Sequence, residues 1–229
     1  MKKKTRIFFT SDLWIDRPNV IAEYNRPFEG TYNMNEKLIE KWNTTVGDFD
    51  MVFILGNFIY NPFIFRNTLE TLRGIKILMP TTVDKYAIRT DRNLLDNLMM
   101  EDTKSAANIL KDFNTNTDNI LFDIACDNFG VASPEQSLNT VIAKSDLIQD
   151  FTVLKTQIFE MPSYGIVVST VPLVEWEGKD DGVLNFHGGK SESNIAEGRI
   201  NVRCDYWDFC PVEMNSVKKI VKQLKGRKK

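Results

Sequence analysis

The sequence has little histidine, little cysteine and no long apolar run. It contains one histidine, His187, and three cysteines, Cys126, Cys204 and Cys210. The cysteines show no Cys-x-x-Cys spacing and are odd in number, which favours free thiols in a reducing compartment. No apolar run is long enough to cross a bilayer, and Met1 to Lys4 lead into a strand pattern rather than a signal sequence. We therefore expect a cytoplasmic chain without membrane contact.

The overall composition is that of an ordinary globular protein. The 229 residues are 42% hydrophobic and 26% charged, with a formal net charge of −2. A chain of this length can bury a single mixed α/β core, so we predict one domain over residues 1–229. No internal repeat or low-complexity tract suggests a further division.

Several apolar, β-branched segments are each followed by a short polar loop. Buried strands have this pattern, and α/β folds place their functional residues just beyond the ends of parallel strands. We predict strands at about 5–10, 51–55, 75–79, 119–125, 151–160, 164–169, 182–187 and 199–206, and helical segments within 18–46 and at 62–73, 92–113 and 212–225. The loops of interest are Thr10 to Trp14, Leu55 to Phe58, Pro80 to Asp84, Ser169 to Pro172 and Phe186 to Ser191.

These loops, in this order, resemble the motifs of the calcineurin-like metallophosphoesterases, especially the small phage-type members. The segment from Asn25 to Phe28, the segment from Asn33 to Asn43 and the strand from Asp50 to Gly56 are similar to that family, as is the closing segment from Ile200 to Val212. The likeness covers about residues 6–86 and 164–220. It implies a four-layer α/β/β/α sandwich of two mixed sheets, and a site for two divalent metal ions such as Mn, Fe or Zn.

The family's metal ligands are largely missing from the matching positions. Asp12 is retained, but the resemblance places Trp14, Thr170, Gly189 and Ser191 where the family has histidines. Asn57 replaces the bridging carboxylate. In the third loop Thr82 replaces a ligand asparagine, Val83 replaces the histidine taken as the general acid, and Asp84 is kept but does not bind metal in the family. His187 falls just before the last motif.

One carboxylate and one amide do not offset the dehydration of a transition-metal ion. We therefore predict no metal, no cofactor and no catalytic residue. Without cations, a buried carboxylate needs another source of compensation. Asp12 is accordingly expected to be neutralised by a basic side chain or by backbone N–H groups, with Arg17 and Lys190 nearby.

Each position also has a purely structural interpretation. Asp12 and Asn57 can serve as turn residues that hydrogen-bond neighbouring loops. Trp14 can fill the volume left by ions and water. His187 is expected to be hydrogen-bonded or exposed rather than a ligand, and Asp84 to pair with Lys85 or Arg89 or to have no measurable role.

Two segments lie outside the family pattern. Residues 87–160 are longer than the corresponding link in small members, which suggests either an insertion with a new function or a longer connection. The tail from about 217 to 229 is basic, and it can contact nucleic acid or an acidic partner or be a solvated helix face. Its cations are Lys218, Lys219, Lys222, Lys225, Arg227, Lys228 and Lys229.

Three functions are compatible with this pattern. The first is an inactive phosphoesterase-like module that binds a protein partner, with a phage or host assembly as its setting and the host cytoplasm or virion as its location. The second is a remodelled phosphoesterase or nuclease that uses Asp12, Asn57, Asp84 and His187 with one weakly bound ion. The third is a nucleic-acid-associated protein that uses the basic tail.

Overall fold

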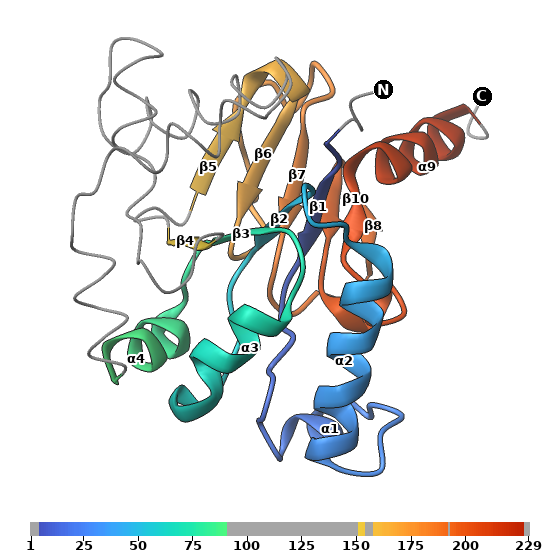
Figure 1. Ribbon diagram of the computed structural model, residues 1–229. Helices are drawn as coiled ribbons and strands as arrows, with labels where there is room; N and C mark the ends of the chain where they lie inside the picture. Colours follow the sequence, from blue (N-terminus) through green and yellow to red (C-terminus); the bar gives the residue numbers. More distant parts are fainter. Residues whose placement is uncertain (1–4, 91–150, 154–157, 192, 227–229) are drawn as a thin grey trace, which may run out of the picture.

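The computed structural model describes residues 5–90, 151–153, 158–191 and 193–226, which contain two five-stranded sheets (Figure 1). The first sheet has the order β10-β1-β2-β3-β4. Its strands β1 to β4 run parallel and β10 pairs antiparallel with β1. The strands are β1 (Ile7–Thr10), β2 (Met51–Ile54), β3 (Ile75–Leu78), β4 (Phe151–Val153) and β10 (Val212–Glu213).

The second sheet has the order β5-β6-β7-β9-β8. Strands β6, β7 and β9 are parallel, whereas β5 and β8 are antiparallel strands at the two edges. The strands are β5 (Ile158–Met161), β6 (Ile166–Ser169), β7 (Leu184–His187), β8 (Ile195–Ala196) and β9 (Arg199–Asn201). Both sheets are therefore mixed, which confirms the predicted mixed α/β class.

The two sheets pack face to face through aromatic and aliphatic side chains. The rings of Phe9 and Phe186 lie 4.6 Å apart between centroids, and those of Phe53 and Phe159 lie 6.3 Å apart. Because strand side chains alternate between faces, Phe8 points to the opposite side of the first sheet from Phe9 and belongs to a second cluster. The first sheet is thus buried on both faces, which explains its nearly continuous apolar strands.

The second cluster is formed with the helices that cover the first sheet, which gather on one side of the molecule in Figure 1. Met34, Leu38 and Trp42 of α2 are buried there, as the helical spacing predicts. The helices are α1 (Val20–Glu23), α2 (Thr31–Thr45), α3 (Phe65–Thr71), α4 (Thr82–Thr90) and α9 (Met214–Gly226), with 3-10 turns η1 (Pro62–Ile64), η2 (Pro162–Tyr164) and η3 (Cys204–Tyr206). Within the described residues, the model contains no helix with the length and apolarity that a membrane span requires.

The structure corrects several boundaries. The strand predicted at 151–160 is two strands in different sheets, because β4 pairs with β3 and β5 pairs with β6. The strand predicted at 199–206 ends at Asn201 and turns into η3, and the helix predicted from 212 starts at Met214 after a short strand. The loop predicted from Pro80 to Asp84 overlaps a helix, because α4 begins at Thr82 and continues to Thr90.

The predicted insertion at 87–160 includes parts of the fold itself. Ala87 and Ile88 of α4 are buried, and Phe151 of β4 packs in the same cluster. The ends of that segment therefore build the first sheet and its helical layer. The helix at 92–113 and the strand at 119–125 lie outside the described residues.

Candidate functional site

The loops at the carboxyl ends of the two sheets meet. Ser11, just after β1, forms a parallel bridge with Arg203, just after β9. Gly188, just after β7, lies so close to the first sheet that a Cβ atom there would be 2.4 Å from the Leu55 carbonyl oxygen. Only glycine fits at this contact, because a real side chain would displace the backbone of the β2 loop. The sequence-predicted loops are thereby brought to one place.

The Asp12 carboxylate lies at the centre of this junction. The side chain is 4% exposed. Its Oδ1 accepts a hydrogen bond from the Asn57 amide at 2.8 Å, and its Oδ2 accepts from the Ser11 hydroxyl at 2.9 Å and the Gly189 N–H at 2.8 Å. Three donors compensate the buried charge, since each replaces a hydrogen bond to water.

One of the three donors to Asp12 is a backbone N–H group, as predicted, and the other two are the Asn57 and Ser11 side chains. Within the described residues no basic side chain forms an ion pair with its carboxylate: Arg17 pairs with Glu23, at 2.8 Å. Burial acts to lower the pKa of Arg203, but the hydrogen bond from Arg203 to Asp205 and the charges of Asp205 and Asp12 raise it overall. Arg203 thus responds to the Asp12 charge without contacting the carboxylate.

Asn57 is a turn residue, as one interpretation predicts, and it also links two loops. Its φ angle of 54° lies in the left-handed region that asparagine tolerates. The side-chain nitrogen donates to Asp12, so its oxygen faces Thr81, whose hydroxyl lies 2.9 Å away. The neutral side chain of Asn57 therefore supplies the Asp12 carboxylate with a hydrogen-bond donor.

Asp84 has a structural role that the sequence interpretation missed. The carboxylate is fully buried and accepts hydrogen bonds at 2.8 Å from the backbone N–H groups of Asn57, Phe58 and Thr81, with the Thr81 hydroxyl at 2.7 Å. Burial raises the pKa of Asp84, and these hydrogen bonds oppose that shift. No ion pair joins Asp84 to Lys85 among the described contacts, and the side chain of Arg89 lies outside the description. Asp84 instead ties the β2 loop to the start of α4.

A buried arginine is the strongest feature that sequence reasoning missed. Arg26 donates to the backbone carbonyls of Asp12 and Leu13, at 2.6 and 2.8 Å, and makes two 2.9 Å contacts with Asp205. Arg203 also bonds Asp205, at 2.8 Å. Burial alone would raise the pKa of Asp205, but these two arginines hold it below its usual range. Arg26 lies in a motif that carries the family resemblance, but its spacing gave no sign of this role.

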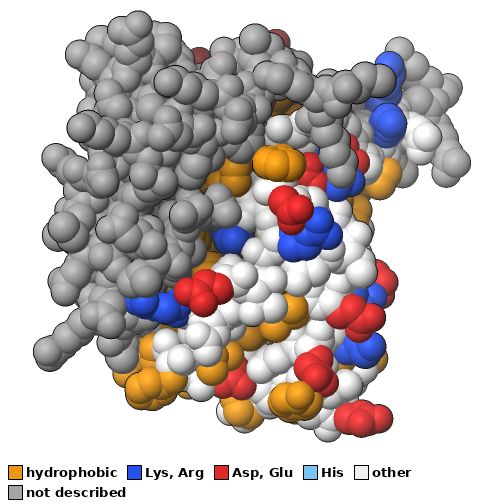
Figure 2. Space-filling view, viewed as in Figure 1, with side chains coloured by type: hydrophobic (Ala, Val, Ile, Leu, Met, Phe, Trp, Pro, Cys, Tyr) orange, Lys and Arg blue, Asp and Glu red, His pale blue; other side chains and the backbone are white. Residues whose placement is uncertain are grey.

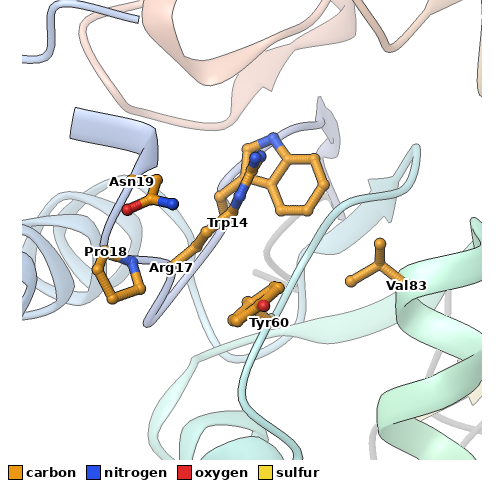
Figure 3. Close-up of a pocket in the computed structure, with 6 residues that line it drawn as sticks. All are labelled: Trp14, Arg17, Pro18, Asn19, Tyr60 and Val83. Carbon is orange, nitrogen blue, oxygen red and sulfur yellow. The ribbon is translucent and has the colours of Figure 1, made fainter. Parts of the chain in front are cut away.

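Trp14 and Val83 both line a small cavity (Figure 3). Trp14 is 9% exposed and belongs to the core cluster. The guanidinium carbon of Arg17 lies 4.2 Å from the centroid of its ring. The cavity, of about 230 Å³, is lined by Trp14, Arg17, Pro18, Asn19, Tyr60 and Val83.

The remaining site positions lie around the β6 and β7 loops. Thr170 is buried, and its carbonyl would lie 3.5 Å from a Cβ atom at Gly189. His187 is buried and its Nδ1 lies 2.8 Å from the Gly188 carbonyl, so the side chain is hydrogen-bonded, which was one of the two expectations for it. Burial lowers the pKa of His187. The Ser191 hydroxyl donates to the Ser193 carbonyl, and Thr82 begins α4.

The two divalent ions implied by the family resemblance do not fit this arrangement. Metal ions need oxygen or nitrogen lone pairs directed at them. Here both Asp12 oxygens accept hydrogen bonds, and Asn57 presents its N–H to Asp12. In the described part of the chain, no group of three histidine, cysteine, aspartate or glutamate side chains could hold an ion. These residues therefore do not supply the ligands that the family's two-metal chemistry needs.

The basic tail is partly built into the fold. Val217 and Val221 of α9 are buried in the same hydrophobic cluster as the facing sides of the two sheets. Lys218 donates a hydrogen bond to the Tyr164 carbonyl. Burial lowers the pKa of Lys218. Lys219 and Lys222 are exposed. The side chain of Lys225 and residues Arg227, Lys228 and Lys229 lie outside the description.

Comparison with known proteins gives information about the fold but identifies no family for this chain. No family model matches the chain. A stretch of 84 residues is 34% identical to an uncharacterised protein of Methanocaldococcus jannaschii, MJ1445, and the match covers 35% of this chain and 48% of that protein. The chain therefore spans about half the length of that relative.

A solved structure extends the likeness over nearly the whole chain. It is that of AQ665, a protein of unknown function from Aquifex aeolicus, with a TM-score of 0.52 and 16% sequence identity, covering 95% of this chain and 100% of that one. At this identity the similarity concerns the fold alone. It supports a mixed α/β arrangement of two sheets.

Proposed function

We propose that this protein is a catalytically inactive member of the metallophosphoesterase-like group, with the four-layer α/β/β/α sandwich of that group, and that it acts as a protein-interaction module. A phage or host assembly is the setting that the resemblance suggests. The single observation that carries the proposal is the Asp12 carboxylate, which accepts hydrogen bonds from Asn57, Ser11 and Gly189.

That network supports inactivity because it satisfies the carboxylate without an ion. Phosphoester hydrolysis in the family requires metal ions that polarise the phosphate and generate hydroxide. Asn57 would have to turn its oxygen toward an ion, which would leave the buried Asp12 oxygen without its donor. An unsatisfied buried acceptor costs about 1 to 3 kcal/mol. Ion binding would therefore compete with the folded arrangement.

The surface beside the cavity supports an interaction role. Trp14, Arg17 and Tyr60 line it, and these are the residue types most enriched among the energetically dominant residues of protein interfaces. Tyr60 is about half exposed and Phe63 of η1 is 87% exposed. Hydrophobic side chains are visible along the lower edge of the molecule in Figure 2, where α1, α3 and α4 lie in Figure 1.

The inactivity is tested with the purified chain, a generic phosphodiester and added Mn²⁺. We expect the same low rate from the natural chain and from the Asp12→Asn variant, because Asp12 is structural. Mn²⁺-dependent turnover that disappears in Asp12→Asn would overturn the proposal. It would favour the remodelled hydrolase, which would use the same carboxylate.

The interaction role is tested by purifying the tagged chain from its native source together with any bound protein. We expect a stoichiometric partner whose recovery falls at least about tenfold when Tyr60→Ser and Phe63→Ser are combined, since interface aromatics of this kind contribute about 1 to 4 kcal/mol each. Tyr32→Ser is the control, because the exposure of Tyr32, 75%, lies between those of Tyr60 and Phe63, but Tyr32 lies at the start of α2. Equal recovery with all variants would remove this surface as the interface.

A further inference from the structure

A second cavity lies beside the β7 loop and has a different chemistry. Its volume is about 280 Å³, and its lining includes two cations, Lys190 and Arg199, together with hydroxyl groups and the imidazole of His187. In the part of the chain that the structure describes, no acidic side chain lines it. A concave surface lined by one sign of charge concentrates ions of the opposite sign.

Among the described residues, which do not include Glu192, the two cations have few competing contacts. Lys190 forms no ion pair with any described residue. Arg199 contacts Glu197 through one nitrogen, at 2.6 Å, and that carboxylate is 75% exposed. A guanidinium has five N–H donors, so most of those on Arg199 remain for another acceptor. A surface ion pair of this kind is weak and can be shared.

The imidazole adds an acceptor to these donors. His187 Nδ1 lies 2.8 Å from the Gly188 carbonyl oxygen, which can only accept, so this nitrogen carries the proton. Burial lowers the pKa of His187, with a smaller contribution from the charge of Arg199. The neutral ring therefore leaves Nε2 as an acceptor. A ligand that has several acceptor oxygens and one O–H group matches this combination.

We propose that the cavity lined by Lys190, Arg199 and His187 binds a tetrahedral oxyanion, either inorganic phosphate or the phosphate group of a small phosphomonoester. Lys190 and Arg199 would donate to its oxygens, and arginine suits this geometry because its donors form a planar fork. The volume lies just below the usual range for ligand pockets, about 300 to 1,000 Å³. It fits a small ion with little attached to it.

This cavity is distinct from the Asp12 junction, although one loop serves both. The Gly189 N–H points to the Asp12 carboxylate, whereas the neighbouring Lys190 and Ser191 line the cavity. Binding there requires no metal and no turnover. The proposal therefore stands or fails independently of the proposed interaction role.

The single histidine of the chain makes a direct test possible. In protein labelled with ¹³C at histidine Cε1, the only ring signal comes from His187. We expect inorganic phosphate, added at constant pH and matched ionic strength, to shift this signal saturably. Phenyl phosphate in a parallel titration distinguishes the two sources: tighter binding than phosphate indicates an ester, and weaker binding indicates the free ion.

The variants Lys190→Gln and Arg199→Gln are expected to weaken phosphate binding at least about tenfold each, since one charge-assisted hydrogen bond is lost in each case. Lys179→Gln, which removes a lysine that pairs with Glu175 elsewhere on the surface, serves as the control and should bind normally. Lys190 lies in a loop after β7, so its variant reports on binding even if Arg199→Gln folds poorly.

Two results would overturn the proposal. One is a His187 signal that does not respond to phosphate beyond its response to sodium chloride of equal ionic strength. The other is a saturable response that is the same in Lys190→Gln as in the natural chain. Calorimetric titration of the same samples checks that the spectral change reports binding.

Discussion

The Asp12 junction and the Lys190 cavity share the loop from His187 to Ser191 but differ in how their polar groups are satisfied. At the junction, the Asp12 and Asp84 carboxylates are buried and surrounded by donors from the same chain. At the cavity, Lys190 has no ionic partner among the described residues, and Arg199 has one exposed partner. Buried carboxylates that accept hydrogen bonds within the chain stabilise the fold, whereas cations without a described ionic partner are available to a ligand. The first region is therefore structural, and the second is where we propose that an oxyanion binds.

The largest effect is expected from Arg26→Gln. Arg26 neutralises Asp205 and holds the Asp12 and Leu13 carbonyls, so its loss leaves a carboxylate and two carbonyls incompletely compensated. Breaking a buried ion pair from one side costs about 3 to 5 kcal/mol of unfolding free energy. Urea denaturation measures it.

Arg17→Gln is the control for Arg26→Gln, because its ion pair with Glu23 is at the surface. We expect a loss below about 1 kcal/mol. Similar losses for the two variants would mean that the junction is not the rigid, satisfied region that the comparison requires.

Asp84→Asn should destabilise the junction by about 2 to 3 kcal/mol, because hydrogen bonds to a charged acceptor are replaced by weaker ones and one amide group opposes the donors. Three of those donors are backbone N–H groups and cannot reverse their direction. The change is measured by urea unfolding at neutral pH. A neutral outcome would place Asp84 outside the network that supports the β2 loop.

Asn57→Asp should cost about 1 to 3 kcal/mol, because it removes the donor to Asp12 and places two carboxylates in contact. Thermal unfolding in the presence of a chelator measures the loss. Asn61→Asp is the matched control, since Asn61 donates to Asp16 in the same way, but Asp16 is only half-buried whereas Asp12 is buried. Equal changes in melting temperature for the two variants would contradict the claim that the hydrogen bond from Asn57 to Asp12 contributes more to stability than an accessible one.

A smaller effect is expected from pH. Because burial lowers the pKa of His187 in the folded state, the unfolded chain binds a proton more readily below its ordinary value of 6.5. Stability from this group is complete above that pH and declines as the pH falls toward the folded pKa. The difference in unfolding free energy between the natural chain and His187→Gln should therefore vary with pH in this window. A constant difference would show that His187 titrates alike in both states.

The sequence predicts the central strands well because burial on both faces leaves few alternatives. Residues 51–54 and 75–78 are apolar runs flanked by turn residues, and both form parallel strands as expected. The split of 151–160 between two sheets was not predictable, since an extended pattern does not specify which sheet each half joins. Helix α4 was missed because the motif resemblance identified the preceding segment as a loop.

Within the candidate site, the sequence located the loops but not their contacts. The resemblance placed Asp12, Asn57 and Gly189 in separate loops, and the structure brings these three together. The hydrogen bonds of Asp84 and the role of Arg26 depend on side-chain geometry across distant segments. No spacing in the sequence encodes that geometry.

The central claim is that Asp12 is held by hydrogen bonds in place of metal ions. Its most direct test is calorimetric titration of Mn²⁺ into the natural chain and into Asp12→Asn, both stripped of metal beforehand. The account predicts the same binding curve for both proteins, with no site that depends on Asp12. A saturable Mn²⁺ site present in the natural chain and lost in Asp12→Asn would contradict it.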